Sequence, residues 1–248
     1  MERGFCVVIP MFNEESGAEQ CVRSVCSVLA TIPVRNRLFV VNDGSIDRTG
    51  DILERLAGEF SALTVVQHAK NSGYGNALRT GASAADAGGF DYVLFMDSDL
   101  TNDPQDLPKF VSKMQQGYDV IKGTRYSGGG NVMGVPFLRV LISAVGNRIA
   151  RILFGLPIHD CTNGFRAIRT PLLMGMRLKE NRFPIIMEEL YWSKFLAKTF
   201  AEVPVILTTR DEELRQTSFV YRPRVFYDYL RYPVLAFFGI KPSGATHE

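Results

Sequence analysis

Two carboxylates stand one residue apart, directly after an apolar run. The run at 92–96 reads YVLFM, and Asp97, Ser98 and Asp99 follow it. Because side chains alternate along an extended chain, both carboxylates would point to the same side, where like charges repel unless a cation lies between them. Oxygen ligands of this kind favour Mg²⁺ or Mn²⁺, which commonly share their coordination shell with substrate phosphates. The pattern predicts a divalent metal site at Asp97 and Asp99; the alternative is a turn or a helix cap.

Two more polar clusters follow the first two apolar runs, at 5–9 and 38–41. The first cluster reads PMFNEE and the second NDGS. In open α/β sheets, ligands bind outside the carboxyl ends of the strands, so both clusters are placed for recognition. Asp43 could accept hydrogen bonds from a base or a ribose. Alternatively, Asn13 and Asp43 only cap the helices that follow them.

A glycine-containing segment at 68–77, HAKNSGYGNA, joins an expected strand to an expected helix. Glycines allow the backbone to approach a phosphate closely, but the third glycine of a dinucleotide fingerprint is missing. Lys70 or Arg79 could offset pyrophosphate charge, and Asn71 and Gly73 lie beside Lys70 in the same loop. We expect Arg79 to be a solvated surface cation.

The elements that must position these clusters alternate in type through the first half of the chain. Helix-spaced apolar residues separate short β-rich runs, which lie at 5–9, 38–41, 63–67, 92–96 and 120–121. This alternation predicts an α/β fold with a mostly parallel sheet flanked by helices. Ser16 and Glu19 have the spacing of a capping box, and Asp103 before Pro104 is typical of a helix cap.

The second half of the chain has a different texture. A flexible SGGG segment at 127–130 precedes a long apolar helical pattern at 137–154, which we interpret as an acceptor-side region. We expect a strand at 165–168, a helix at 188–196 and a strand at 203–208. These elements complete a body at 1–215, and an aromatic and basic tail follows at 216–248.

Composition narrows the class of protein. With 248 residues and 46% hydrophobic content, the chain can bury the core of one globular domain. A net charge of +2 is too small to indicate nucleic-acid binding. The four cysteines have neither metal-ligand spacing nor the density of a disulfide scaffold, so we expect buried thiols in a reducing compartment.

The sequence indicates contact with a membrane surface and no helix that spans the membrane. The chain begins without the pattern of a signal peptide, and the apolar run at 234–240 is far below the roughly 20 residues that a spanning helix needs. The tail mixes aromatic residues with arginines, as segments at the headgroup level of a membrane do. Aromatic residues docked on the body would give the same pattern. We expect a cytoplasmic protein that is peripheral at the cytoplasmic face of a membrane.

Six motifs together resemble a known family. They are VVIPMFNEES, VVNDGSIDRTG, NSGYGNALRTG, FMDSDLTNDP, GTRYSGG and DCTNGFRAIR, in this order. The chain is similar over roughly residues 5 to 210 to family 2 glycosyltransferases, which have the Rossmann-like GT-A fold. Within that family it resembles the dolichyl-phosphate mannosyltransferases and their polyprenyl-phosphate relatives.

The resemblance implies inverting sugar transfer from a nucleotide sugar to a polyprenyl phosphate, with Mg²⁺ or Mn²⁺ at Asp97 and Asp99. The expected donor is GDP-mannose, and the alternative is UDP-glucose or another nucleotide sugar. By the same match, the nucleoside would be held by Pro10, Phe12, Asn13, Glu14 and Asp43. The further residues expected to bind substrate are Gly44, Lys70, Asn71, Gly73 and Ser98. Those implied near donor or acceptor phosphates are Arg125, Arg139 and Arg166.

The sequence departs from the family pattern in three places. Thr101 and Asn163 stand where relatives often carry other polar residues. Relatives also carry an arginine followed by Gly-x-Ser-Lys, whereas this chain reads TTRDEELRQTSFVYR. Arg210 or Arg215 with Ser218 could replace that motif, although the lysine is absent.

The chemistry of the acceptor decides whether a base is needed. A phosphate monoester has a second pKa of about 6 and arrives ionised, whereas a hydroxyl must lose its proton to a carboxylate. Glu188 and Glu189 lie near where hydroxyl-acceptor members of the broader family carry their basic carboxylate, and Asp160 is a second candidate for that base. The alternative for Glu188 is a first-turn helix charge favoured by the helix dipole.

Two rival functions remain on sequence grounds. A nucleotidyltransferase also uses metal-binding carboxylates, but it usually carries a glycine-rich basic loop where this chain has PMFNEES. A non-catalytic protein that kept the fold is the second rival, and the intact Asp43, Asp97, Asp99 and Arg166 argue against it. A membrane-protein partner or a second copy of the chain remains open.

Overall fold

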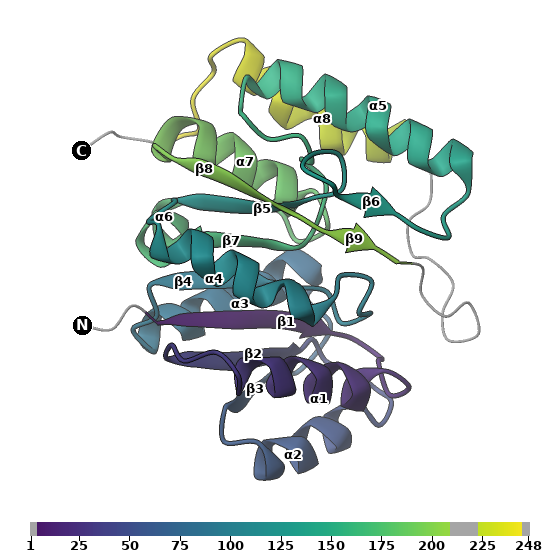
Figure 1. Ribbon diagram of the computed structural model, residues 1–248, viewed down its shortest axis with the longest axis vertical. Helices are drawn as coiled ribbons and strands as arrows, with labels where there is room; N and C mark the ends of the chain where they lie inside the picture. The colour runs from purple at the N-terminus through teal and green to yellow at the C-terminus, as the bar shows by residue number, and fades with distance from the viewer. Residues whose placement is uncertain (1–3, 209–222, 245–248) are drawn as a thin grey trace.

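A seven-stranded sheet forms the centre of the molecule, with helices on both faces (Figure 1). The structure, a computed structural model, describes residues 4–208 and 223–244. The strands of this sheet, in spatial order, are β3 (Leu63–Gln67), β2 (Asn36–Asn42), β1 (Phe5–Met11), β4 (Tyr92–Phe95), β7 (Arg166–Arg169), β5 (Val120–Thr124) and β8 (Phe200–Pro204). A second, two-stranded sheet pairs β6 (Asn131–Val132) with β9 (Ile206–Leu207).

The helices connect these strands in the alternating order that the sequence predicts. They are α1 (Ala18–Leu29), α2 (Thr49–Glu59), α3 (Tyr74–Ala87), α4 (Leu107–Gln115), α5 (Phe137–Phe154), α6 (Thr170–Gly175), α7 (Ile185–Leu196) and α8 (Pro223–Phe237). Strand β1 runs parallel to β2 and β4, β2 to β3, and β5 to β8. Strand β7 is antiparallel to both of its neighbours. The prediction of a mostly parallel α/β fold is therefore confirmed.

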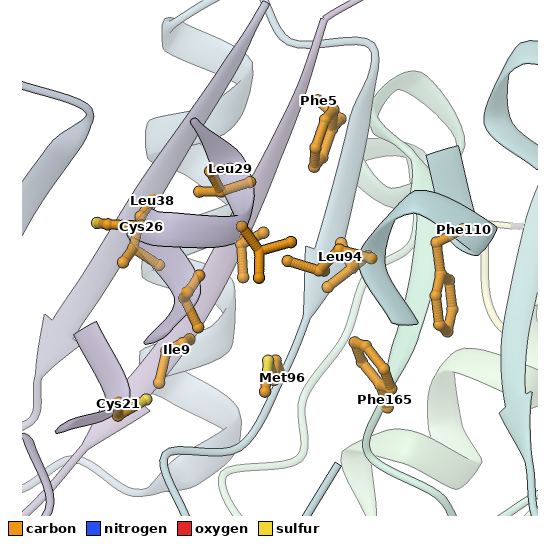
Figure 2. Close-up of a cluster of buried hydrophobic side chains, with 14 of the residues drawn as sticks. Phe5, Ile9, Cys21, Cys26, Leu29, Leu38, Leu94, Met96, Phe110 and Phe165 are labelled. Atoms are coloured by element: carbon orange, nitrogen blue, oxygen red, sulfur yellow. The ribbon is translucent and has the colours of Figure 1, made fainter. Parts of the chain in front are cut away.

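The core has two layers because the side chains of each buried strand alternate between the two faces of the sheet. On β1, Phe5, Val7 and Ile9 pack under α1, α2 and α4, whereas Cys6 and Val8 pack under α3 and α7. Figure 2 shows the first layer, in which apolar side chains from α1, α4 and the central strands meet. Together the two layers anchor the strands, and therefore the loops at the strand ends.

All four cysteines are free and buried, as expected. Cys21 and Cys26 belong to the first layer of the core, and Cys6 and Cys161 to the second. Burial raises the pKa values of all four thiols, so they stay protonated and poorly reactive.

Of the two helix caps expected from the sequence, the structure lacks one and contains the other. The capping box was wrong: α1 begins at Ala18 after Gly17 without a side-chain cap, and the exposed Glu19 pairs instead with Arg23 and Arg55. The cap at Asp103 is confirmed, because its carboxylate accepts a hydrogen bond from the backbone N–H of Gln105 at 2.9 Å.

The strand expected at 203–208 is split between two sheets. Strand β8 starts earlier, at Phe200, and ends at Pro204. Strand β9 then pairs with β6 outside the main sheet.

The described part of the tail docks on the body. Helix α8 lies beside α5 and also contacts α7 (Figure 1). Tyr232 and Ala236 of α8 are buried in the second layer of the core, and the Tyr191 hydroxyl donates to the Ile240 carbonyl at 2.7 Å. Within residues 4–208 and 223–244, no helix has the length and apolar content needed to cross a membrane.

Candidate functional site

The loops after β1, β2 and β4 meet at one edge of the sheet, where parallel strands bring their carboxyl ends together. The Ser98 hydroxyl, after β4, donates to Glu14 Oε1 at 2.9 Å. Asn13 Oδ1 accepts from the backbone N–H of Ile46 at 3.0 Å, and the Asn13 N–H donates to the Ser45 hydroxyl at 3.0 Å. Three of the predicted clusters are thus joined directly by side-chain hydrogen bonds.

The loop after β1 is shaped around Asn13. This residue has a left-handed backbone with φ 53°, a conformation that asparagine adopts more readily than most residues. Pro10 is half-buried behind it, and Phe12 exposes 38% of its surface at the edge of the site. The alternative, that Asn13 caps the following helix, is wrong: α1 begins after Gly17 without a side-chain cap, and Asn13 binds the loop after β2 instead.

Asp43 is buried after β2 and binds the loop that precedes α3. Its Oδ1 accepts from the Ser72 N–H at 2.9 Å and from His68 Nδ1 at 2.7 Å, and its Oδ2 accepts from the Gly73 N–H at 2.8 Å. It does not cap α2, which begins after Arg48 without a side-chain cap. The carboxylate therefore shapes the loop at 68–73.

Two glycines allow close approaches around this loop. Gly44 has φ 70°, and a Cβ there would lie 2.3 Å from the carbonyl carbon of Lys70. Gly73 has φ 95°, and its Cβ would lie 2.4 Å from the Asn181 carbonyl oxygen. Lys70 and Asn71, in the same loop at 68–73, are exposed.

Arg79 is not the solvated surface cation that we expected from the sequence. It is half-buried and donates to the Glu180 carbonyl and, at 2.6 Å, to Asn181 Oδ1. The segment at 178–183 is thereby tied to α3. Sequence reasoning missed this contact because the partners lie about a hundred residues apart.

Asp97 and Asp99 are half-buried at the carboxyl end of β4. Asp97 Oδ1 accepts from the Tyr74 hydroxyl at 2.9 Å. Asp99 Oδ1 accepts from the N–H and the hydroxyl of Thr101, at 3.1 and 2.8 Å, which is the turn that the sequence left open as an alternative. Burial, and then the charge of Asp97, raise the pKa of Tyr74, so its hydroxyl stays protonated and donates.

The donor set at this edge fits a hard divalent cation that keeps open positions. Within the described residues, no group of three or more His, Cys, Asp and Glu side chains could hold a metal. A site of two carboxylates, Asp97 and Asp99, suits Mg²⁺ or Mn²⁺, because these ions usually take remaining ligands from water and substrate phosphates. A structural zinc site would need four protein ligands.

Asp160 and Arg125 form a buried pair beside β5. Arg125 donates to both carboxylate oxygens of Asp160, with Nε to Oδ2 at 2.6 Å and a second contact at 2.9 Å. Burial opposes ionisation of Asp160, but the Arg125 guanidinium lowers its pKa on balance. A carboxylate so paired is a weak base.

Arg166 lies beneath the site rather than facing it. Its side chain is 1% exposed and forms a two-pronged pair with Glu189, and it also donates to the Gly164 carbonyl at 2.7 Å. The guanidinium lies over the Phe95 ring, 4.5 Å from its centroid. Because Glu189 neutralises this charge inside the core, the structure gives no support to a direct phosphate contact by Arg166.

Glu188 accepts hydrogen bonds from backbone N–H groups. Its carboxylate accepts from the N–H groups of Lys179 and Glu180, each at 2.9 Å. Burial raises the pKa of Glu188 to about 7. It lies in the first turn of α7, as the sequence alternative had it, and its oxygens are engaged by the segment at 178–183.

Two residues near the site, Lys122 and Tyr74, were not predicted from the sequence. Lys122 is fully buried on β5 and donates to the Asn163 carbonyl at 2.6 Å, and burial lowers its pKa to about 8. A lysine within an apolar strand is the signal that could have identified it. Tyr74 lies in the GYG motif, but nothing in its spacing points to Asp97.

The remaining candidates are one exposed arginine and three residues that the structure does not describe. Arg139 is exposed on α5. Arg210, Arg215 and Ser218, and with them the substitute for the missing lysine motif, lie outside the described residues. Their roles stay predictions.

Comparison with known proteins identifies the family by sequence. The model of "Glycosyl transferase family 2" matches residues 6–175. A dolichol-phosphate mannosyltransferase of Pyrococcus furiosus is 32% identical over 202 residues, which are 80% of this chain and 54% of that protein. A polyprenol monophosphomannose synthase of Mycolicibacterium smegmatis is 29% identical over 84% of this chain and 78% of that protein. The chain thus spans about half the length of the first relative and more of the second.

Solved structures share the fold. Glucosyl-3-phosphoglycerate synthase from Mycobacterium tuberculosis, in complex with Mn²⁺, UDP and glucosyl-3-phosphoglycerate, superposes with a TM-score of 0.66 at 23% identity, covering 98% of this chain and 82% of that one. TarS of S. aureus, in complex with UDP-GlcNAc, gives 0.65 at 20% identity, covering 98% and 68%. At these identities the likeness concerns the fold.

Proposed function

Since this chain belongs to glycosyl transferase family 2 and has the GT-A fold, we propose that it transfers a sugar with inversion from a nucleotide sugar to a polyprenyl phosphate. That it is a glycosyltransferase follows from the family. The finer assignment, mannose from GDP-mannose to a dolichyl-type phosphate, is supported by the two mannosyltransferase relatives. UDP-glucose is the alternative donor.

The observation that carries the donor side is the meeting of three strand-end loops around two carboxylates. Asp97 and Asp99 are the residues that would hold Mg²⁺ or Mn²⁺, and such an ion would stabilise the charge on the departing nucleoside diphosphate as a Lewis acid. Glu14 fixes Ser98 between them. Lys70 is exposed and its backbone lies against Gly44, so its charge would offset that of a pyrophosphate held by the β2 loop.

The engagement of the candidate bases supports a phosphate acceptor. Asp160 is neutralised by Arg125 and Glu189 by Arg166, and Glu188 is bound to two backbone N–H groups. A hydroxyl nucleophile would need one of them to take its proton. A phosphate monoester with a second pKa of about 6 is already a nucleophile at neutral pH.

An exposed apolar face on α5 supports contact with a membrane surface, where a polyprenyl phosphate would lie. The exposed side chains are Phe137, Leu138, Leu141, Ile142, Val145, Ile149 and Ile152. Helix α5 also carries three arginines and no acidic residue, a charge that suits anionic lipid. Tyr227 and Phe237 of the neighbouring α8 are exposed too. We propose peripheral attachment at the cytoplasmic face.

The test is an assay of the purified protein with Mn²⁺ and a panel of nucleotide sugars, with and without polyprenyl phosphate. We expect mannosyl transfer from GDP-mannose to the lipid phosphate, loss of turnover in EDTA, and recovery with Mn²⁺ or Mg²⁺. Asp99→Ala should remain folded and lose activity. Transfer to a sugar hydroxyl, or full activity of Asp99→Ala, would refute the acceptor or the metal assignment respectively.

A further inference from the structure

One hydrogen bond links the metal site to a residue with no assigned role. Tyr74, the first residue of α3, donates its hydroxyl to Asp97 Oδ1 at 2.9 Å. Asp97 stands two residues beyond the end of β4. The bond therefore joins the start of a helix on one face of the sheet to a carboxylate at its edge.

The ring of Tyr74 is held in place from outside α3. It packs against Phe183, with ring centroids 4.6 Å apart and the planes inclined at 31°. The N–H of Gly75 donates to the Asn181 carbonyl at 3.0 Å, so the first turn of α3 is fixed to the segment that carries Phe183. A tyrosine confined in this way keeps its hydroxyl at one point.

The other side of Asp97 is closed by backbone. A Cβ on Gly164 would lie 2.6 Å from Asp97 Oδ2, so a larger residue there would push the carboxylate from this position. Arg166, paired with the buried Glu189, donates to the Gly164 carbonyl at 2.7 Å and holds this backbone against Asp97. The carboxylate is enclosed between a hydroxyl and a glycine.

We propose that Tyr74 is a positioning residue for the divalent cation: its hydroxyl, opposite Gly164, fixes the orientation in which Asp97 meets the ion. The inference rests on the proposed function, because it takes Asp97 as a ligand. Groups that hydrogen-bond to a metal ligand restrict its orientation, and their removal typically weakens metal affinity about 10- to 100-fold. The buried Arg166 and Glu189 then act on the same carboxylate through Gly164.

The test measures metal binding directly. Tyr74→Phe keeps the ring on Phe183 and removes only the donor. Mn²⁺ is titrated into the protein with GDP, and separately with UDP, and free Mn²⁺ is followed by electron paramagnetic resonance. We expect Mn²⁺ affinity to fall roughly 10- to 100-fold.

The matched control is Tyr92→Phe. Tyr92 is buried at the opposite end of the same β4 strand, and its hydroxyl donates to the Tyr118 carbonyl at 2.8 Å. This variant loses a comparable buried hydroxyl and should bind Mn²⁺ as the parent protein does. Circular dichroism melting of both variants checks that they are folded.

A second variant approaches the carboxylate from its other side. Gly164→Ala adds the Cβ that would press on Asp97 Oδ2, so it should also weaken Mn²⁺ binding while Tyr74 is intact. It keeps the question answerable if Tyr74→Phe does not fold.

The outcomes separate this inference from the proposed function. Parent-like Mn²⁺ affinity in Tyr74→Phe, with binding lost in Asp97→Ala, would overturn the role of Tyr74 and leave the metal site standing. Parent-like affinity in Gly164→Ala, or an equal loss in Tyr92→Phe, would also overturn it. A parent protein that binds no Mn²⁺ with either nucleotide would remove the metal site itself, and the role of Tyr74 with it.

Discussion

Arg166 and Glu189 form a charged pair inside the core. Both side chains are almost wholly inaccessible, and the guanidinium covers the Phe95 ring. A buried pair of this kind adds little net stability, but removing one partner leaves an uncompensated charge in the interior. The arginine of the DCTNGFRAIR motif therefore acts on the site through Gly164 and the core.

Glu189→Gln tests this view at a single residue. Because Arg166 would lose its counter-charge, we expect the free energy of unfolding to fall by about 3 kcal/mol or more, measured by urea denaturation. Glu19→Gln, which disturbs only the exposed pairs with Arg23 and Arg55, is the control and should scarcely change the midpoint. Equal midpoints for the two variants would contradict the buried-charge account.

Glu188 should also make the stability of the protein depend on pH. Burial raises its pKa in the folded protein from 4.5 to about 7. Between these values the folded state binds a proton that the unfolded state has released, so stability falls as pH rises from about 4.5 to 7. We expect a loss of up to about 3 kcal/mol across this window, and a flatter profile in Glu188→Gln. Parallel profiles in urea unfolding would contradict the assignment.

The same variant tests the acceptor. If the nucleophile is an ionised phosphate, Glu188→Gln should retain appreciable activity, and the rate should follow acceptor ionisation with an apparent pKa near 6. Loss of a required base would instead cost roughly 10² to 10⁴ in rate. A near-total loss with donor binding intact would move the assignment to a hydroxyl acceptor.

At the scale of elements, α5 and α8 form a pair with an inner and an outer side. Tyr232 and Ala236 of α8, with Ala150 and Phe154 of α5, belong to the core, while other apolar residues of both helices face outward. Deleting the tail should therefore lower the melting temperature, and it cannot isolate membrane binding. Surface substitutions on α5 can.

Phe137→Ser with Leu138→Ser is the sharper experiment, because these side chains expose 80% and 65% of their surface. Burying each in a bilayer interface is worth about 1.5–3 kcal/mol, so co-sedimentation with anionic liposomes should weaken at least tenfold at an unchanged melting temperature. Met174→Ser, on α6, removes an exposed apolar side chain elsewhere and serves as control. Unchanged co-sedimentation of the double variant would exclude α5 as the contact.

At the scale of the whole molecule, the sequence predicted the features that depend on residues close together in the chain. Short β-rich runs and helical spacing identified the first five strands of the main sheet and their helices, and the strand-end rule brought Asn13, Asp43 and Asp97 to one edge. The partners of these residues could not be predicted, because Asp43 binds residues 25 to 30 positions later, and Arg79 binds residues about a hundred positions later. The antiparallel direction of β7 was also unpredictable, since strand direction depends on where the chain re-enters the sheet.

That re-entry also bears on how the chain folds as it is synthesised. Strands β1 to β4 are neighbours in the sheet and can pair as soon as residue 95 has emerged. Strand β5 has β7 and β8 as its neighbours, and both come later in the sequence, so it stays unpaired until residue 166 has followed. During this interval Val120 and Ile121 are exposed in a strand with open edges, where early chains are most prone to aggregate or to need a chaperone.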